Sequence, residues 1–362
     1  MKQPSTSVNV NVFGLTDVGR AREHNEDSFL IADLTTGLTS PDPGLTRHTV
    51  GPGGTILMVA DGLGGAAAGE LASQLAVDTV LETMRERWAD KINDGGTADS
   101  AQFAAALKAA TEAANSKIHS FALEHPEHRG MGTTSTIAGV LNDTLYLAQV
   151  GDSRAYLIRG GQAQQITKDQ SLMQRLVDAG ELTQEEAERS ERRNIILQAL
   201  GPESTVKVDV TIQQLREGDT LILCTDGLSG LVKPDEIASE ASSEPEPSCL
   251  CERLVELANE NGGPDNITAI VAHFEGDGLL GAMDTDSVGY TTFKLPGSTT
   301  PVDPADAIRR QTTLETPVIT PGGTRVTGLD RSERAGHAFM LGALATIILL
   351  VVFIAARHFR GP

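Results

Sequence analysis

TILMVADGLGG, residues 55–65, is an apolar run that ends in Asp-Gly, and TLILCTDGLSG, residues 220–230, repeats the pattern. A buried strand that ends in an ionised aspartate is unstable unless the charge has a partner. Two matched ends, at Asp61 and Asp226, therefore point to a shared divalent cation. The glycines that follow let the backbone turn and offer a carbonyl oxygen as a further ligand. The alternative is a pair of ordinary Asp-Gly turns, which are common at strand ends.

Further carboxylates stand at similar turns along the chain. They are Glu26 and Asp27 in REHNED, Asp152 in VGDSR and Asp265 in GGPDN. Oxygen ligands without His or Cys suit Mg²⁺ or Mn²⁺ rather than zinc or copper. A pair of such ions lowers the pKa of a bridging water, which gives a nucleophile for the hydrolysis of a phosphoester.

Arg22, beside Glu26 and Asp27 in the chain, has a natural task in such a reaction. Its planar guanidinium can hold two phosphate oxygens and stabilise the charge that develops in the transition state. A surface salt bridge with Glu23 or Glu26 is the simpler alternative, and Arg22 taken alone favours it.

Apolar runs alternate with helical stretches over residues 8–274. Strands are expected at 8–16, 27–32, 55–60, 135–141, 144–150, 155–159, 221–225 and 268–274. Helices are expected at 71–87, 100–124 and 247–261, short surface helices within 172–192, and a long loop at 35–54. Strands in hairpins together with paired helices indicate a layered α+β domain rather than a doubly wound parallel sheet.

The composition narrows the function classes. The 362 residues carry a formal net charge of -20 and only 4% aromatic side chains, so the core must consist mainly of Ala, Val, Leu and Ile. An acidic surface excludes DNA or RNA as the expected partner, because phosphate backbones require Lys and Arg. The cysteines Cys224, Cys249 and Cys251 form no CxxC pair. Structural zinc and a disulfide framework are therefore not expected, and the domain is assigned to a reducing compartment.

Two segments follow the domain at 8–274. Residues 275–336 are rich in Thr, Pro and Gly, which is typical of a flexible, disordered linker. Residues 337–357 include an uncharged apolar stretch with Arg and His on both sides. Because about twenty apolar residues span a bilayer as a helix, the sequence predicts one C-terminal transmembrane helix. The domain is placed in the cytoplasm, where phosphoproteins and free thiols occur.

In these motifs the chain resembles the PPM-type, or protein phosphatase 2C, metal-dependent Ser/Thr phosphatases, and especially their compact bacterial branch. The resemblance covers residues 10–274 and rests on motifs that occur in family order. They are DVGRAREHNEDS (17–28), VADGLGG with AGE (59–70), GMGTTST (130–136), VGDSRAYLIRGG (150–161), LILCTDGLSG (221–230) and GGPDNIT (262–268). The resemblance implies an α-β-β-α sandwich of two antiparallel sheets flanked by helices, with the metals at one end between the sheets.

The resemblance also assigns the ligands of two Mn²⁺ or Mg²⁺ ions. Asp61 would bridge the two ions, and the Gly62 carbonyl would bind one of them. Asp226 and Asp265 would complete the pair. Asp61 and Asp226, together with Arg22, are the expected catalytic residues.

The remaining candidate residues receive supporting roles from the same resemblance. Glu26 and Asp27 would hold water on the metals, and Asp152 would bind a third, weaker ion. Arg22 would grip the substrate phosphate. Residues 165–194 would form a mobile flap beside the site.

Three positions depart from the family pattern. Leu63 stands where eukaryotic members carry a histidine proposed as the general acid. Ala66 and Gln170 stand where bacterial members commonly carry histidine. None of the three is a metal ligand in the family, so altered tuning rather than loss of activity is expected.

The expected function is the hydrolysis of phosphoserine and phosphothreonine on proteins, in opposition to a membrane-tethered Ser/Thr kinase. The motifs fit equally a phosphatase that acts on an anti-sigma-antagonist type regulator. A non-catalytic membrane scaffold that binds phosphopeptides through a decayed site is a further alternative, but every expected aspartate ligand is retained. A divalent-cation sensor would explain the carboxylates and leave Arg22 without a task.

Overall fold

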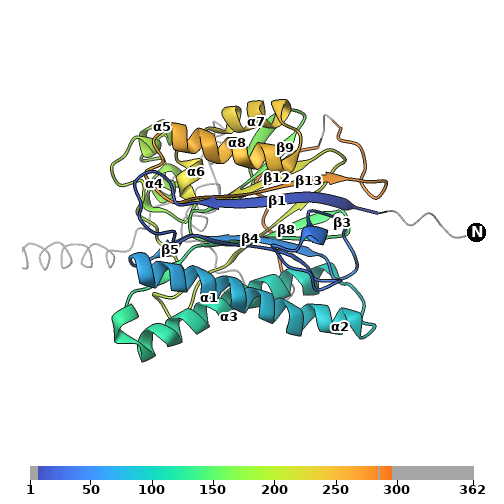
Figure 1. The fold of residues 1–362 in the computed structure, drawn as a ribbon, viewed down its shortest axis with the longest axis horizontal. Helices are drawn as coiled ribbons and strands as arrows, with labels where there is room; N and C mark the ends of the chain where they lie inside the picture. The colour runs from blue at the N-terminus through green and yellow to red at the C-terminus, as the bar shows by residue number, and fades with distance from the viewer. Residues whose placement is uncertain (1–6, 284–285, 296–362) are drawn as a thin grey trace, which may run out of the picture. The chain divides into compact units, whose positions relative to one another are not determined.

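A computed structural model describes residues 7–283 and 286–295 of the chain. These residues form two antiparallel sheets packed face to face, with helices on both outer faces (Figure 1). The α+β class with antiparallel sheets and flanking helices, predicted from the sequence, is confirmed.

Each sheet combines strands from distant parts of the chain. The first sheet contains β1 (Asn9–Asp17), β3 (Arg47–Thr49), β9 (Arg154–Arg159), β10 (Gln162–Gln165), β12 (Thr220–Cys224) and β13 (Ile267–Glu275). The second contains β2 (Ser28–Asp33), β4 (Thr55–Ala60), β7 (Ser135–Leu141), β8 (Thr144–Val150) and β11 (Asp209–Gln214). Within the described residues, the strand orders are β10-β9-β12-β13-β1-β3 and β11-β8-β7-β4-β2. A short ribbon pairs β5 (Gly62–Leu63) with β6 (Gly132–Thr133).

The burial of β4 explains why its sequence is an unbroken apolar run. Ile56 and Met58 face the helices that cover the second sheet, whereas Leu57 and Val59 face the first sheet. Side chains alternate between the two faces of a strand, and both faces of β4 are covered. From Ile56 to Ala60, no position of the strand is therefore left for a polar residue.

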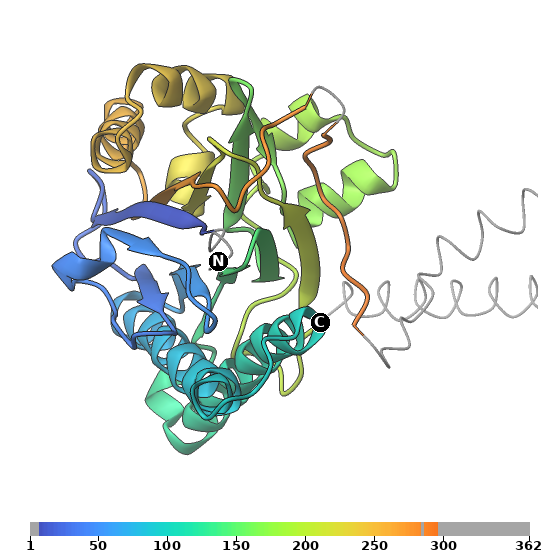
Figure 2. The same cartoon turned by 90° about the vertical axis from the view of Figure 1, so that its right-hand side faces the viewer.

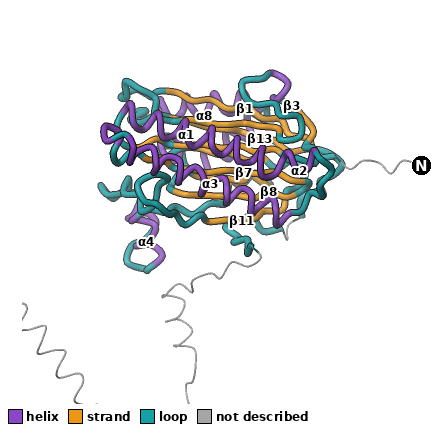
Figure 3. The backbone as a smooth tube through the Cα atoms, turned by 90° about the horizontal axis from the view of Figure 1, so that it is seen from below, coloured by secondary structure: helices purple, strands orange, loops and turns teal. Residues whose placement is uncertain are grey.

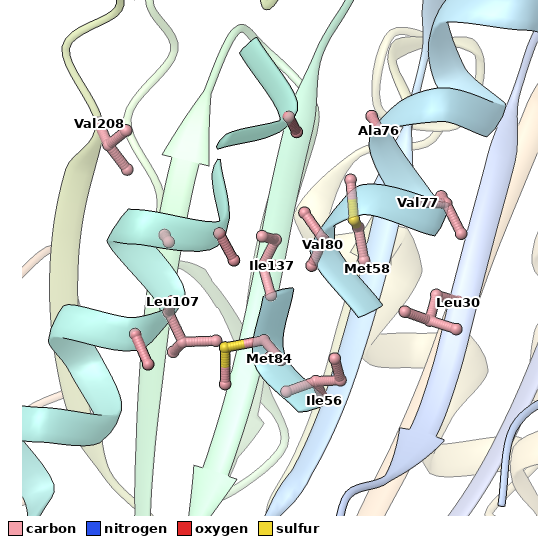
Figure 4. Packing of buried hydrophobic residues seen from close by; sticks show 14 of the residues in the cluster. Leu30, Ile56, Met58, Ala76, Val77, Val80, Met84, Leu107, Ile137 and Val208 are labelled. Atoms are coloured by element: carbon pink, nitrogen blue, oxygen red, sulfur yellow. The ribbon is translucent and has the colours of Figure 1, made fainter. Parts of the chain in front are cut away.

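Two long helices, α1 (Ala66–Met84) and α3 (Ser100–Glu124), lie across the outer face of the second sheet (Figure 3). α1 continues through a π-helical turn, Arg85–Ala89, into α2 (Asp90–Asn93). α3 begins at Ser100 because the Asp99 side chain accepts the Gln102 N–H as an N-cap. Figure 4 shows Met84 of α1 and Leu107 of α3 packed over the sheet residues Ile56 and Ile137.

The first sheet is covered by α7 (Pro234–Ser243) and α8 (Pro247–Glu260) (Figure 1). Both helices start with proline, which suits the first helical turn because it lacks the backbone N–H that would have no partner there. Leu250 and Leu254 of α8 pack with Ile222 of β12 and Tyr156 of β9 in a third apolar cluster. The two sheets and their helices thus bury three layers of apolar side chains.

Three short helices gather at one end of the sandwich, on the left in Figure 1. They are α4 (Leu172–Asp178), α5 (Gln184–Glu188) and α6 (Asp226–Ser229). Only Thr225 separates β12 from α6, and only Asp61 separates β4 from β5. This end of the sandwich therefore collects the two Asp-Gly turns from opposite sheets.

Residues 286–295 run along the free edge of β11 (Figure 2). The Ile212 N–H donates to the Thr291 carbonyl oxygen at 2.9 Å, and the Phe293 N–H donates to the Val210 carbonyl oxygen at 2.8 Å. Arg216 pairs with Asp286 at 2.7 Å. The folded part of the chain thus extends past residue 274, where the sequence placed its end.

Most of the expected strands and helices are present, with ends shifted by a few residues. The sequence did not predict β10, β11, α6 or α7, and the expected loop at 35–54 contains β3 and a short 3-10 turn. No helix in the described ranges has the length and apolar character needed to cross a bilayer. The predicted transmembrane helix at 337–357, and the predicted linker beyond residue 295, lie outside the described residues.

Candidate metal centre

The end of β4 is fixed by two threonines of the GMGTTST motif. The Asp61 N–H donates to Thr134 Oγ1 at 2.9 Å. The Asp61 carbonyl oxygen accepts from Thr133 Oγ1 and from the Thr134 N–H, both at 2.9 Å. Thr134 Oγ1 also lies 2.7 Å from Ser153 Oγ, beside Asp152. Thr134 therefore connects the Asp61 turn to the Asp152 turn, a role that the sequence did not reveal.

Gly62 is required because other backbone segments approach it closely. A Cβ atom there would lie 2.3 Å from the Gly69 carbonyl oxygen and 2.5 Å from the Glu26 carbonyl oxygen. A Cβ on Gly69, in the first turns of α1, would lie 1.9 Å from Glu26 Oε2. The small residues after Asp61 thus let α1 and the Glu26 loop close around the turn.

The second Asp-Gly turn is enclosed in the same way. A Cβ on Gly227 would lie 2.0 Å from the Asn266 carbonyl oxygen, so the turn that carries Asp226 packs directly on the loop that carries Asp265. Only glycine fits at this contact. The two aspartates from separate motifs are brought together by that approach.

Asn266 joins three segments and was missed as a functional residue. Its Oδ1 accepts the Glu26 N–H at 2.8 Å, and its Nδ2 donates to the Val18 and His24 carbonyl oxygens at 2.9 Å each. The loop that carries Arg22 and Glu26 is thereby tied to the residue after Asp265. No local sequence pattern can predict contacts between residues that lie more than 200 positions apart in the chain.

Asp27 is held below the site by two hydroxyl groups. Thr225 Oγ1 donates to Asp27 Oδ2 at 2.8 Å, and Thr268 Oγ1 donates to the same oxygen at 2.6 Å. Burial raises the pKa of Asp27 to about 7, although both hydroxyls oppose the rise. Asp27 therefore sits among protein groups and does not line the cavity described next.

A cavity of about 140 Å³ opens where these turns meet. Every predicted site residue except Asp27 lines it. The lining consists of Arg22, Glu26, Asp61, Gly62, Leu63, Thr134, Asp152, Asn194, Ile196, Asp226, Asp265 and Asn266. Carboxylates from both sheets and one guanidinium thus face a single space.

Arg22 stands at this cavity with its side chain half exposed. Its Nη2 donates to Asp265 Oδ2 at 2.8 Å. That hydrogen bond, with the charges of Asp265 and other carboxylates, raises the pKa of Arg22, so the guanidinium stays charged. The sequence offered Glu23 or Glu26 as ion-pair partners, but the partner in the structure is Asp265.

A family model described as Protein phosphatase 2C matches residues 34–268, which is more than half of this chain. This chain belongs to the protein phosphatase 2C family. Serine/threonine protein phosphatase PstP of Mycobacterium tuberculosis (strain ATCC 25618 / H37Rv) is 41% identical over 235 residues, which are 64% of this chain and 43% of that protein. The chain therefore spans less than half the length of that relative.

Protein phosphatase PhpP of Streptococcus pneumoniae is 36% identical over 265 residues, which are 73% of this chain and 97% of that protein. The crystal structure of the catalytic domain of PstP in complex with 2 manganese ions superposes with a TM-score of 0.60 at 35% identity. It covers 74% of this chain and 99% of that chain. Phosphatases of the 2C type use Mn²⁺ or Mg²⁺.

The carboxylates of this 2C site repel one another. Burial, followed by repulsion from Asp27 and Asp226, raises the pKa of Asp61 well above its ordinary value of 3.8. Burial, followed by Asp226, raises the pKa of Asp152 to about 8. Burial, followed by repulsion from the charge of Asp265, raises the pKa of Asp226. A divalent cation would remove this repulsion, and oxygen ligands match the preference of Mn²⁺ and Mg²⁺.

The fit is incomplete in one respect. Within residues 7–283 and 286–295, no three His, Cys, Asp or Glu side chains already converge as the ligands of one ion. A centre built here would therefore need carbonyl oxygens and water beside the carboxylates, which is usual for these cations. The Gly62 carbonyl is the backbone oxygen that the family resemblance assigns to it.

A second cavity of about 140 Å³ adjoins the first and extends below α4 and α5. It shares Asp152, Asp226, Asp265 and Asn194 with the first cavity. Residues 165–194, the expected flap of the 2C fold, therefore border the site. Leu63 lines the first cavity and is partly exposed, so the position of the eukaryotic histidine holds no proton donor here.

Proposed function

We propose that this chain is a protein serine/threonine phosphatase with a binuclear Mn²⁺ or Mg²⁺ centre. The observation that carries the proposal is the convergence of Asp61, Asp226, Asp152 and Asp265 from both sheets on one cavity with Arg22. The relatives are themselves named as serine/threonine phosphatases.

The ions would be held by Asp61, the Gly62 carbonyl, Asp226 and Asp265, with a weaker ion at Asp152. When bound, they supply the activated water and neutralise charge on the phosphoryl group. The protein contributes by holding the carboxylates in position, because buried hydrogen bonds fix the strand ends before the substrate binds.

Arg22 binds the phosphate in this proposal. It uses Nη2 on Asp265, and a guanidinium has five N–H donors in total. Donors therefore remain for two phosphate oxygens while the bond to Asp265 holds the side chain in place. Half of the Arg22 side chain is exposed, so a phosphoserine or phosphothreonine on a protein surface can reach it.

The physiological substrate is proposed to be the phosphoprotein pool of a membrane-tethered Ser/Thr kinase, with the phosphatase domain in the cytoplasm. The support is the apolar stretch at 338–356 and the free thiols of the domain. A deletion of residues 337–357 should leave the hydrolysis of a small ester unchanged and slow the dephosphorylation of a membrane-embedded phosphoprotein. If the deletion changes neither rate, the proposal that the apolar stretch brings the enzyme to its substrate is wrong.

The activity itself is tested on the full chain in detergent with p-nitrophenyl phosphate and a phosphothreonine peptide. We expect turnover with Mn²⁺ or Mg²⁺, none with chelator, and a loss of at least about 10³-fold in Asp226→Ala. Asp90→Ala, an exposed position in α2 remote from the cavity, is the matched control. A folded chain without turnover in either metal would favour a phosphopeptide-binding scaffold instead.

A further inference from the structure

Gln170 holds both backbone polar groups of Gly151, the residue before Asp152. The Gln170 N–H donates to the Gly151 carbonyl oxygen at 2.9 Å. The Gln170 side chain returns the contact, because its Oε1 accepts the Gly151 N–H at 3.0 Å. A single residue from the segment before α4 thus closes both sides of the Asp152 turn.

Gly151 is the flexible point of that turn. Its φ is +102°, a conformation that residues with a side chain rarely adopt. A Cβ atom there would also lie 2.7 Å from Thr134 Cγ2. No larger residue can therefore stiffen the turn from within, and the direction of Asp152 must be set by contacts from outside.

The amide of Gln170 is itself anchored on the second sheet. Its Nε2 donates to Asp209 Oδ2 at 3.0 Å. Asp209 is the first residue of β11 and lies opposite Gln149 of β8 in the strand register. A hydrogen bond to a carboxylate is stronger than one between neutral groups. It orients the amide so that Oε1, and not Nε2, faces Gly151.

We propose that Gln170 is a positioning residue that fixes the direction of the Asp152 carboxylate and so sets the metal affinity on that side of the cavity. Gln170 lines neither of the two cavities, so it acts through Gly151 and not on substrate. The proposal rests on the metal-dependent function proposed above. Partners behind a metal ligand typically change metal affinity by about 10- to 100-fold when they are lost.

The first test compares Gln170→Met with the parent chain, both as full chains in detergent. Methionine keeps the length of the side chain and removes both hydrogen bonds. In metal-free protein we expect faster hydrogen exchange of the Gly151 amide, with exchange in β4 and β12 unchanged. In calorimetric titrations with Mn²⁺, the weakest binding step should lose about 10-fold in affinity, whereas the tighter steps keep theirs.

Gln74→Met is the matched control. Gln74 makes an amide-to-carboxylate hydrogen bond of 3.0 Å to Asp78, the same length as that between Gln170 and Asp209, but on the exposed surface of α1. This variant should leave Gly151 exchange and Mn²⁺ binding unchanged.

An exchange of charge between Gln170 and Asp209 tests whether Gln170 acts by positioning Asp152 or only by stabilising the fold. In Gln170→Glu, an oxygen still accepts the Gly151 N–H, but the second oxygen faces the Asp209 carboxylate and is repelled. Adding Asp209→Asn supplies an N–H donor to that oxygen. We expect Gln170→Glu to weaken the same Mn²⁺ step, Asp209→Asn alone to change it little, and the double variant to recover most of the loss.

Unchanged Gly151 exchange and unchanged Mn²⁺ binding in Gln170→Met would overturn the proposal. So would a double variant as impaired as Gln170→Glu, and this second result decides the matter if the methionine variant does not fold. Because exchange and Mn²⁺ binding are measured without substrate, a parent chain that lacks phosphatase activity would refute the proposed function and leave this test intact.

Discussion

At the scale of single residues, Arg22 lines the cavity with a group whose charge and shape can be tested separately. Arg22→Lys keeps the positive charge and loses the planar fork that can hold two phosphate oxygens. We expect kcat/KM for a phosphothreonine peptide to fall by about 100-fold. Arg47→Lys, in an exposed ion pair with Glu275, should change nothing. A small effect of both substitutions would assign Arg22 to the surface.

Gly69→Ala sets two effects against each other. Within a helix, alanine is favoured over glycine by about 1 kcal/mol. At this position, however, the new Cβ would lie 1.9 Å from Glu26 Oε2, and the Glu26 carboxylate must leave its place. We expect the melting temperature to change little and metal-dependent activity to fall about 10-fold. Gly281→Ala, where a Cβ meets nothing within 4 Å, is the control, and a fully active Gly69→Ala would show that Glu26 is dispensable.

At the scale of secondary-structure elements, burial separates the three cysteines. Cys224 in β12 and Cys251 in α8 are buried, and burial raises the pKa of each thiol to about 12. Cys249, also in α8, is exposed. At about pH 8 we expect a thiol reagent to label the native domain at Cys249 alone, because burial keeps Cys224 and Cys251 protonated and away from the reagent. Labelling of the native Cys249→Ser variant would contradict the burial of Cys224 and Cys251.

The sequence predicted well those elements whose apolar pattern follows directly from burial. β4 and β12 are covered on both faces, so their runs and terminal aspartates stand out. β11 was missed because its sequence, DVTIQQ, is that of a half-covered edge strand with polar ends. α7 was missed because Ser and Glu dominate it. The roles of Asn266 and Gln170 depend on partners far away in the chain, and one sequence contains no record of such pairs.

The edge of β11 yields a prediction about truncation. Phe293 packs edge-on against Tyr146 with ring centroids 5.5 Å apart, and Arg216 pairs with Asp286. A chain ending at residue 274 loses both contacts and exposes the strand edge. We expect it to melt below a chain ending at residue 295, with the aromatic contact alone worth about 1 kcal/mol. Equal melting temperatures would mean that residues 276–295 are only an attached tail.

At the scale of the whole molecule, the carboxylate cluster links stability to pH and metal. The pKa of Asp27 is raised to about 7 and that of Asp152 to about 8, against ordinary values of 3.8. Without metal, the folded chain therefore holds protons that the unfolded chain has released. The free energy of unfolding should fall as pH rises from about 4 to about 8, because the unfolded state then binds fewer protons.

Added Mn²⁺ should reverse this trend, since it takes the place of the protons. We expect the gain in melting temperature on adding Mn²⁺ to be larger at about pH 8.5 than at about pH 6. Thermal melts with chelator and with Mn²⁺ at both pH values measure it. A gain that is as large at the lower pH would show that the carboxylates are already ionised in the metal-free chain.

The pairing of β1 with β13 has a consequence for how the protein is made. β1 leaves the ribosome long before its partner strand, yet its nine-residue ladder needs Ile267–Glu275. Asp265, which contacts Arg22, is synthesised only just before them. A chain halted anywhere earlier in translation lacks both the closing strand and a complete set of site carboxylates. Copies halted before β13 therefore cannot assemble the site, and the proposed phosphatase activity begins only once Ile267–Glu275 have been translated.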